Sequence, residues 1–436
     1  MKNISSFISE EIQKVFKSKF GKSVLMISGG TIFAQMLSML LSPIITRLYT
    51  PEEFGTLSLY VSILTIIIFS TTFSYDVAIP VADDEKKAVN ILSLCTIILF
   101  LSTIILTIIL FFFGESLLNY FNANSLVKYK YLMPLGFFTT GFYTSLSQWT
   151  IRKKDFKSIS ITKYSQSITG NITKIILGYL SLGTVGLLAG QILKSGAGIS
   201  TLLKPVLIND RNLIKNVSVK NIKNAAKRYM RFPLYTAPTK LLLSLSTHLP
   251  FIFISGLYST SIVGLYSLAN IITFLPTTLV SQSVGDVFLG EAASIGKNNA
   301  KRIKELYNKL LKKLILIVSV PMIILIIFGP ILFAFVFGQN WYEAGVYSRI
   351  LTIYMFSYFI FHPSSGVFYI FEKQNLSLFL NIINISVVLI TFGAAKIFSL
   401  SSYTTVLFFS VGKSFVEIIR YFLIQKILND SIKMEN

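Results

Sequence analysis

Uninterrupted apolar blocks of 18 or more residues recur along this chain. As a helix, a block of that length crosses the ~30 Å hydrocarbon core of a bilayer, whereas the strands of a membrane barrel alternate apolar and polar residues over ~10 positions. Only 14% of the 436 residues are charged, against about 25% in soluble domains. The blocks therefore predict an all-α polytopic membrane protein and exclude a water-soluble fold.

The apolar blocks define twelve expected transmembrane helices. They cover residues 23–46, 54–80, 88–113, 131–151, 158–180, 183–203, 233–257, 261–289, 314–337, 344–371, 376–398 and 402–428. Several exceed 25 residues, so tilt or kinks are expected. The charged segment 1–22 lacks the features of a cleavable signal peptide and predicts an amphipathic helix on the cytoplasmic membrane surface.

Basic residues set the expected orientation. With the N-terminus inside, cytoplasmic connections hold 29 of the 40 Lys and Arg residues, counting Lys426 just inside the last span. Eight others lie within spans, and the outer connections hold only Arg47, Lys128 and Lys130. This asymmetry predicts a bacterial inner-membrane protein with both termini in the cytoplasm. It also explains the net charge of +21 through contact with anionic lipid heads, so nucleic acid is not an expected partner.

An internal repeat relates the two halves of the chain. Leu48-Tyr49, Gly55 and Ser58-Leu59 recur 209 residues later, and Lys194-Ser195 recurs as Lys413-Ser414 at an offset of 219. We therefore expect two parallel six-helix bundles related by a pseudo-two-fold axis along the membrane normal, with a substrate site where they meet. The expected domains are an N-terminal segment 1–22, bundles 23–203 and 233–428, a basic linker 204–232 and a tail 429–436.

Ionisable residues within the spans are the candidate functional groups, because a charge in the membrane costs a few kcal/mol or more. Lys194 and Lys413 lie near the middle of their spans and Lys240 about two turns into its own. We interpret six residues as lining a cationic, water-filled, substrate-binding cavity: Arg47, Lys194, Lys240, Lys413, Glu417 and Arg420. Four further residues are candidates for gating or ion coupling: Asp76, Asp286, Arg349 and His362.

Each of these assignments has a purely structural alternative. Lys174, Arg349 and Lys396 can extend to the outer interface. Lys413, Glu417 and Arg420 share one helix face and can neutralise one another without a ligand. Asp76 and Asp286 can pair with basic loops or cap helix ends, and His248 and His362 can simply be packing residues.

Enzyme signatures are not found in the sequence. There is no Walker A loop, no H-E-x-x-H and no G-x-S-x-G, and Gly412-Lys413-Ser414 lacks the upstream glycine of a P-loop. The single cysteine, Cys95, excludes an internal disulfide and a cysteine metal cluster. We therefore expect no catalytic residue, metal or cofactor, and transport energy from a proton or sodium gradient, the membrane potential or the substrate gradient.

Three stretches near the N-terminus carry a family resemblance. Ser28-Gly29-Gly30-Thr31 through Gln35, the run from Arg47 to Gly55 (R-L-Y-T-P-E-E-F-G) and the run from Tyr75 to Pro80 resemble Wzx-type polysaccharide flippases. These belong to the MOP superfamily, together with MATE exporters and lipid II flippases. The resemblance is strongest over residues 20–100 and rests on topology and repeat elsewhere.

The resemblance implies a function. It implies alternating-access transport of an undecaprenyl-pyrophosphate-linked repeat unit for O-antigen, capsule or exopolysaccharide synthesis, with polysaccharide polymerase and glycosyltransferases as candidate partners. Arg47 aligns with Gly256 in the second repeat, so any role of Arg47 belongs to one half only. The rival hypotheses are a cation-coupled MATE-type drug exporter, for which an acid-rich cavity is expected, and a non-transporting scaffold, which has no reason to keep deep lysines.

Overall fold

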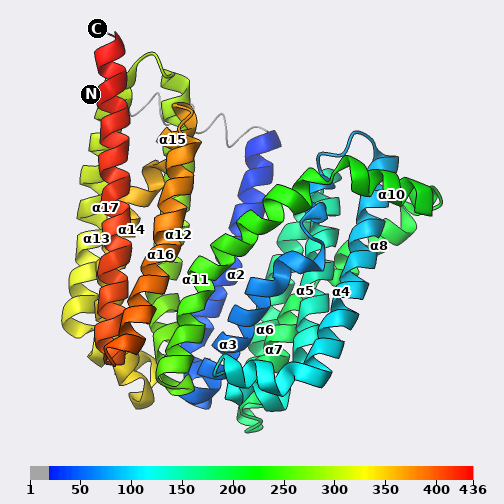
Figure 1. The fold of residues 1–436 in the computed structure, drawn as a ribbon, viewed down its shortest axis with the longest axis horizontal. Coiled ribbons are helices and arrows are strands. Elements are labelled where there is room, and N and C mark those ends of the chain that lie inside the picture. Colours follow the sequence, from blue (N-terminus) through cyan, green and yellow to red (C-terminus); the bar gives the residue numbers. More distant parts are fainter. Residues whose placement is uncertain (1–18, 436) are drawn as a thin grey trace. The chain divides into compact units, whose positions relative to one another are not determined.

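The computed structural model describes residues 19–435, with side chains from Gly29 onward, and all regular structure in that range is helical. Most of the predicted surface segment 1–22 lies outside the described residues. The principal helices (Figure 1) are α2 (Lys19–Leu48), α3 (Pro51–Ile67), α4 (Glu85–Tyr120), α5 (Leu132–Arg152), α6 (Phe156–Tyr179), α7 (Thr184–Gly196), α8 (Ile199–Ile208), α9 (Arg211–Ile214), α10 (Val219–Arg228), α11 (Ala237–Leu257), α12 (Thr260–Ile295), α13 (Ala300–Phe337), α14 (Tyr342–Phe361), α15 (Val367–Ile370), α16 (Gln374–Ile397) and α17 (Ser402–Glu435).

A helix, or a pair of helices separated by a break, lies at each of the twelve predicted spans. Within residues 19–435, eight segments are both long and apolar enough to cross a membrane. Their apolar side chains are widely exposed; Phe111, Phe112 and Phe113 on α4, for example, are 61–69% accessible. Such faces require a lipid environment. The predicted class of helical membrane protein is confirmed, and the count of twelve spans remains a prediction.

Contacts divide the described chain into two compact units. Unit 1 holds the residues up to Tyr49, then 60–120 and 124–241, and unit 2 holds 50–59, 121–123 and 242–435. The chain therefore passes from unit 2 into unit 1 within α3 and back within α11. Residues 204–232, predicted as a linker, pack into unit 1, where α10 lies against α4 and buries Ala225 and Tyr229.

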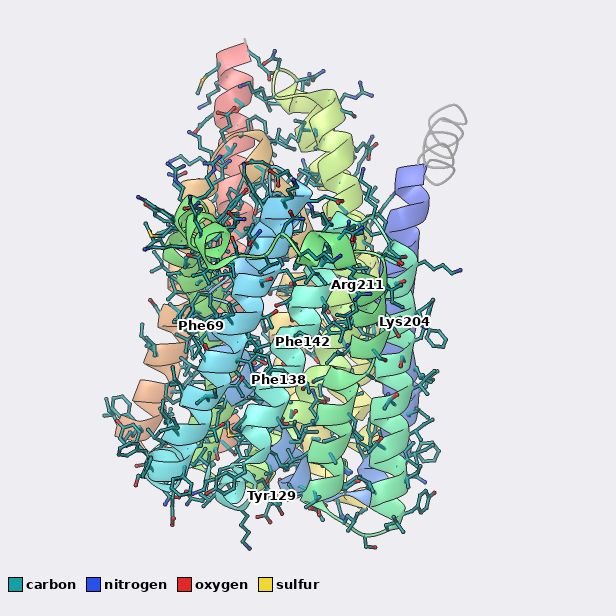
Figure 2. The ribbon with its side chains drawn as sticks, turned by 90° about the vertical axis from the view of Figure 1, so that its right-hand side faces the viewer. Phe69, Tyr129, Phe138, Phe142, Lys204 and Arg211 are labelled. Atoms are coloured by element: carbon teal, nitrogen blue, oxygen red, sulfur yellow. The ribbon has the colours of Figure 1, made fainter. Side chains whose placement is uncertain are left out.

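Unit 1 is built from helices that pack both against their neighbours in sequence and against helices farther along the chain. α2 packs along α6, α6 against α7, and α4 and α7 against α5. A core of Leu146, Trp149 and residues of α4 and α8 fills one end. Figure 2 places Lys204 and Arg211 toward one end of this unit and Tyr129 at the other. Which of these two ends faces the cytoplasm remains a prediction from the sequence.

Unit 2 is organised around α14, which packs against α12, α13 and α17, while α16 packs on α17. Its core contains Phe288, Tyr307, Phe368 and Val416. Side-chain caps define several helix starts. Ser259 accepts a hydrogen bond from the Ile262 N–H at the start of α12, and Asn299 accepts one from Arg302 at the start of α13. Such caps satisfy N–H groups that have no partner within the helix.

The sixth predicted span is not continuous, and Lys194, predicted near its midpoint, lies just before the break. α7 ends at Gly196, Ala197 is extended, and Gly198 has φ = +95° before α8 begins. Lys194 therefore lies in the last turn of a short helix. That end carries the negative part of the helix dipole, which stabilises a positive side chain.

The Gly198 break gives a stability prediction. Replacement by alanine combines a left-handed backbone with a β-carbon only 2.6 Å from Thr162 Cβ, so we expect Gly198→Ala to destabilise unit 1 by about 2 kcal/mol or more. Gly393→Ala is the matched control, because a β-carbon there meets nothing within 4 Å. Thermal unfolding in detergent measures both. Equal midpoints for the two variants would show that the break imposes no constraint.

Two other predicted spans are also interrupted. After α3, non-glycine residues Phe73 and Ser74 adopt left-handed φ values of 46° and 62°. In the tenth span, α14 ends at Phe361 and a 3-10 segment, His362–Gly366, separates it from α15. Local strain of this kind is maintained only where the surroundings impose it, and it concentrates at functional sites. Both breaks adjoin residues predicted to have a role.

Candidate functional site: buried charges in the two units

A reciprocal glycine–lysine contact joins α6 and α7 in unit 1. The motif Gly-x-x-x-Lys occurs at Gly170–Lys174 on α6 and at Gly190–Lys194 on α7. A β-carbon on Gly170 would lie 2.6 Å from Lys194 Cβ, and one on Gly190 would overlap Lys174 Cγ. Each lysine stem thus lies over the glycine of the other helix, which allows a close helix approach.

Lys163 extends this basic group along α6. Lys163, Gln166, Ser167, Gly170, Asn171 and Lys174 recur at three- and four-residue spacing, which places them on one helix face. We call these six residues the α6 polar stripe. Its two lysines are about 16 Å apart along the helix axis. Lys163 Nζ lies 5.1 Å from the Tyr143 ring centre, a cation–π contact.

The stripe lysines and Lys194 have no acidic partner. α6 and α7 contain no Asp or Glu, and none of these three lysines forms an ion pair among the described residues. Three like charges in a membrane domain without a carboxylate are unfavourable unless an anion joins them.

Polar groups of α2 complete the surroundings of the stripe. Asn171 Nδ2 donates to Ser38 Oγ at 2.9 Å, and Ser167 Oγ donates to the Ala34 carbonyl at 2.8 Å. Gln35 Oε1 is buried without a hydrogen-bond partner. The α2–α6 contact therefore offers amide and hydroxyl groups, one of which has unused acceptor capacity.

Lys240 is paired with Asp76 at the break that follows α3. Lys240 Nζ lies 3.7 Å from Asp76 Oδ2, and the Thr72 hydroxyl donates to Asp76 Oδ1 at 2.6 Å. The Asp76 side chain is 4% exposed and that of Lys240 42%. The structure thus brings together one predicted cavity cation and one predicted gating acid. Asp286, the other acid predicted for gating or ion coupling, is exposed on α12.

Lys413 in unit 2 is buried among neutral oxygen atoms. Its Nζ donates to Asn384 Oδ1 at 3.1 Å, the Asn384 carbonyl at 3.2 Å and Ser246 Oγ at 3.4 Å, and it lies 5.6 Å from the Phe409 ring centre. The side chain is 5% exposed. Its donors are satisfied within unit 2, so Lys413 and Lys194, although repeat equivalents, have different environments.

Glu417 and Arg420 form a buried bidentate ion pair on α17. Arg420 Nε lies 2.8 Å from Glu417 Oε2 and Nη2 lies 3.3 Å from Oε1, while Nη1 donates to Ser365 Oγ at 3.0 Å. His362 Nδ1 approaches Glu417 Oε1 to 3.8 Å without a hydrogen bond. On α17, the charge of Glu417 is therefore compensated by Arg420. Lys413 takes no part in this ion pair and binds Asn384.

Two predicted residues take other positions. Arg47 lies in the last turn of α2 with an exposed side chain. Arg349 donates from Nη2 to the Ile327 carbonyl at 2.7 Å, one turn before Pro330 in α13. Because proline lacks an N–H, the helix loses the bond from position 330 to the carbonyl of residue 326, and Arg349 binds the carbonyl next to it. Arg349 thus connects α14 to α13.

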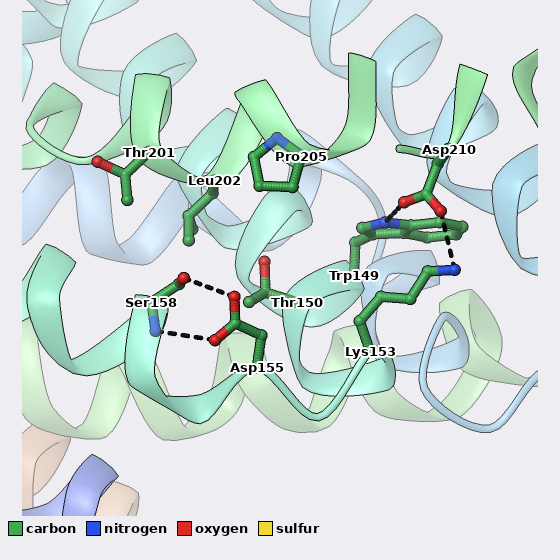
Figure 3. A pocket seen from close by; sticks show the side chains of 9 residues that line it. All are labelled: Trp149, Thr150, Lys153, Asp155, Ser158, Thr201, Leu202, Pro205 and Asp210. Carbon is green, nitrogen blue, oxygen red and sulfur yellow. Dashed lines mark hydrogen bonds and ion pairs between the residues drawn. The ribbon is translucent and has the colours of Figure 1, made fainter. Parts of the chain in front are cut away.

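Figure 3 shows the residues that line a small cavity in unit 1. The cavity has a volume of about 40 Å³ and lies at the end of the unit where the predicted cytoplasmic connections are found. Trp149 Nε1 and Lys153 Nζ both donate to Asp210, each at 2.9 Å, and Lys153 also reaches Glu85 at 2.8 Å. Partial burial lowers the pKa of Lys153, but these two carboxylates outweigh it and leave the pKa raised. The volume suits about one water molecule, so this cluster is a structural tie between α5, α4 and the end of α8.

Known structures define the class. An inward-facing multidrug resistance MATE family transporter of the MOP superfamily matches with a TM-score of 0.68 at 16% identity, over 92% of this chain and 96% of that one. Lipid II flippase MurJ in an inward closed conformation matches with a TM-score of 0.67 at 17% identity, over 94% of this chain and 91% of that one. A MOP superfamily transporter from Pyrococcus furiosus matches with a TM-score of 0.54 at 15% identity, over 96% of this chain and 98% of that one. The fold is that of the MOP superfamily transporters.

The family follows from the sequence match. The family model of polysaccharide biosynthesis proteins matches residues 44–346, which is more than half of the chain. The protein therefore belongs to the polysaccharide biosynthesis protein family, as its resemblance to Wzx-type flippases indicated. Among curated protein sequences, none matches this chain.

Proposed function

We propose that this protein is a flippase that moves an undecaprenyl-pyrophosphate-linked oligosaccharide from the cytoplasmic to the outer leaflet of the bacterial inner membrane. The observation that carries the proposal is the set of three lysines, Lys163, Lys174 and Lys194, that lack an acidic partner on α6 and α7. A pyrophosphate that leaves bulk water needs cationic donors, and charge-assisted hydrogen bonds from lysine supply them. Membership in the polysaccharide biosynthesis family supports a glycan as the cargo.

The α6 polar stripe suits the head of such a lipid. Lysines at its two ends provide charge, and Gln166, Ser167 and Asn171 between them provide hydroxyl and amide groups of the kind that bind sugar hydroxyls. The lipid tail stays in the bilayer while the head crosses within the protein by alternating access. No bond is made or broken, and energy comes from a proton or sodium gradient, the membrane potential or the substrate gradient.

The alternative of a MATE-type exporter of cationic drugs shares the fold but not this charge pattern. A site for organic cations needs carboxylates or aromatic faces. In the described part of unit 1, the buried acids Asp76 and Asp210 already have lysine partners, Lys240 at 3.7 Å and Lys153 at 2.9 Å. α6 and α7 offer no acid. The local chemistry therefore favours an anionic cargo.

Deletion of the gene in its own host tests the proposal. We expect surface polysaccharide to be lost and its undecaprenyl-pyrophosphate-linked precursor to accumulate on the cytoplasmic face, with drug susceptibility unchanged. Thin-layer analysis of lipid-linked saccharides and immunoblotting of surface glycan measure the outcome. Normal surface glycan together with greater sensitivity to cationic drugs would refute the flippase and favour the exporter.

A further inference from the structure

One face of α10 packs against unit 1. Ala225 and Tyr229 belong to the core that this helix shares with the first turns of α4. Two hydrogen bonds fasten the same face: the Tyr75 hydroxyl donates to the Ala226 carbonyl at 3.0 Å, and the Asp83 N–H donates to the Tyr229 hydroxyl at 3.3 Å. α10 is therefore a fixed part of unit 1, and its exposed face has a defined direction.

The exposed face of α10 is basic. Lys220, Lys223 and Lys227 recur at three- and four-residue spacing, which places them on one side of the helix. The buried Ala225 lies on the other side. All three lysines are exposed, α10 contains no Asp or Glu, and among residues 29–435 none of the three forms an ion pair. We call these three lysines the α10 basic face.

Acidic residues at the start of α4 already have other partners. Asp83 binds Lys87 and Glu85 binds Lys153, each at 2.8 Å. Lys87 and, to a smaller extent, Arg228 lower the pKa of Asp83, so the one arginine of α10 serves this carboxylate. The α10 basic face therefore lacks a counter-charge in the described part of unit 1 and is available to an anion from outside the chain.

The position of α10 determines which anion it meets. α10 packs on the first turns of α4 and ends shortly before α11 begins, and the segments Glu85–Tyr120 and Phe232–Leu257 are both long and apolar enough to cross a membrane. Figure 1 shows α10 lying across the direction of α4 rather than along it. A basic amphipathic helix between the ends of two such segments lies at the level of the lipid headgroups.

Exposed apolar side chains at the same edge favour lipid over a protein partner. Met230, Leu234 and Tyr235 are 50%, 58% and 70% exposed, and they lie where the chain passes from α10 into α11. Side chains of this kind beside a basic helix contact the acyl chains of lipids whose phosphates meet the basic residues. An acidic protein that binds from the aqueous side would match the charge but leave these apolar side chains without a partner.

We propose that the α10 basic face is a binding site for the phosphate headgroups of anionic phospholipids. By the predicted orientation, these lipids belong to the cytoplasmic leaflet. Each lysine ammonium supplies a charge-assisted hydrogen bond to a lipid phosphate, while Leu234 and Tyr235 contact the acyl chains. The site uses none of the residues of the α6 polar stripe and does not depend on the identity of the cargo.

Titration of the purified protein with phosphatidylglycerol tests the site, and phosphatidylcholine is the neutral probe. Native mass spectrometry measures the bound lipid, and the thermal midpoint reports the stabilisation that a ligand of the folded state provides. We expect wild type to bind phosphatidylglycerol at least about tenfold more tightly than phosphatidylcholine, because each lysine near an anionic surface contributes about fivefold. In Lys220→Gln/Lys223→Gln/Lys227→Gln, this preference should fall by at least about tenfold.

Lys301→Gln/Arg302→Gln/Lys309→Gln is the matched control, since it removes three exposed basic side chains from α13 in unit 2, and it should keep the wild-type preference. Salt provides a test that is free of any effect of the substitutions on folding, because about 1 M NaCl screens exposed charges and should abolish the preference of the wild type. Equal preference in wild type and the α10 variant, an equal loss in both variants, or a preference that salt leaves unchanged would overturn the lipid site.

Discussion

Replacing Lys174 and Lys194 together by alanine is expected to remove at least nine-tenths of the surface polysaccharide in a complemented deletion strain, with normal protein abundance. The two side chains belong to one helix contact and have no acidic partner on α6 or α7. Each charge-assisted hydrogen bond to phosphate contributes about 1.5–3 kcal/mol, and 1.4 kcal/mol corresponds to a tenfold change in affinity. Loss of both donors is therefore expected to weaken binding of the lipid head by about a hundredfold or more.

Two controls define this result. Lys396→Ala removes an exposed lysine at the end of α16 and should leave polysaccharide at the wild-type level. Lys174→Arg/Lys194→Arg keeps both charges, and because the stems lie over glycines, partial activity is expected. If the alanine pair keeps wild-type polysaccharide at equal abundance, these lysines do not bind the cargo. If it reduces abundance as well, thermal midpoints of the purified variants separate folding from binding.

Removing only one partner of the Glu417–Arg420 pair is expected to have the largest effect on stability. The side chains of Arg420 and Glu417 are only 6% and 2% exposed, and an uncompensated buried charge costs about 3–5 kcal/mol. Glu417→Leu leaves the Arg420 guanidinium with Ser365 alone. We therefore expect a large fall in monodisperse protein on size-exclusion chromatography and in the thermal midpoint.

The double variant Glu417→Leu/Arg420→Met is the matched control, since it removes both charges and keeps apolar volume. We expect it to recover most of the lost stability, because replacing a buried pair by apolar residues is often neutral. Recovery of stability without recovery of polysaccharide would add a transport role to the structural one. A double variant as unstable as the single would show that the pair is not the origin of the loss.

Much of the fold could be predicted because the sequence patterns that indicate it extend over many residues. Apolar blocks of about 20 residues identified the positions of the helices, and the repeat at an offset of 209 singled out Gly55, Ser58 and their equivalents, which meet one another in space. The breaks in the helices were harder to predict from the sequence. Gly198 interrupts span six without any change in hydropathy, and its left-handed backbone depends on packing against Thr162.

The site was predicted in part. Its depth in the span marks Lys194, whereas the sequence equally allows Lys174 to extend to the outer interface and gives no sign that Lys163 belongs to the group. The repeated Gly-x-x-x-Lys of α6 and α7 was the signal that could have joined them. Partners chosen by tertiary contact, such as Asp76 for Lys240 and Asn384 for Lys413, lie far apart in the chain, and no local pattern reveals them.

The central claim is that the lysines of α6 and α7 bind the anionic head of the lipid, and a direct binding measurement tests it. The affinity of the purified protein for undecaprenyl pyrophosphate is compared with its affinity for undecaprenol, in wild type and in Lys174→Gln/Lys194→Gln. We predict that wild type prefers the pyrophosphate by at least about tenfold and that the variant loses this preference while still binding undecaprenol. An equal preference in both proteins would contradict the account.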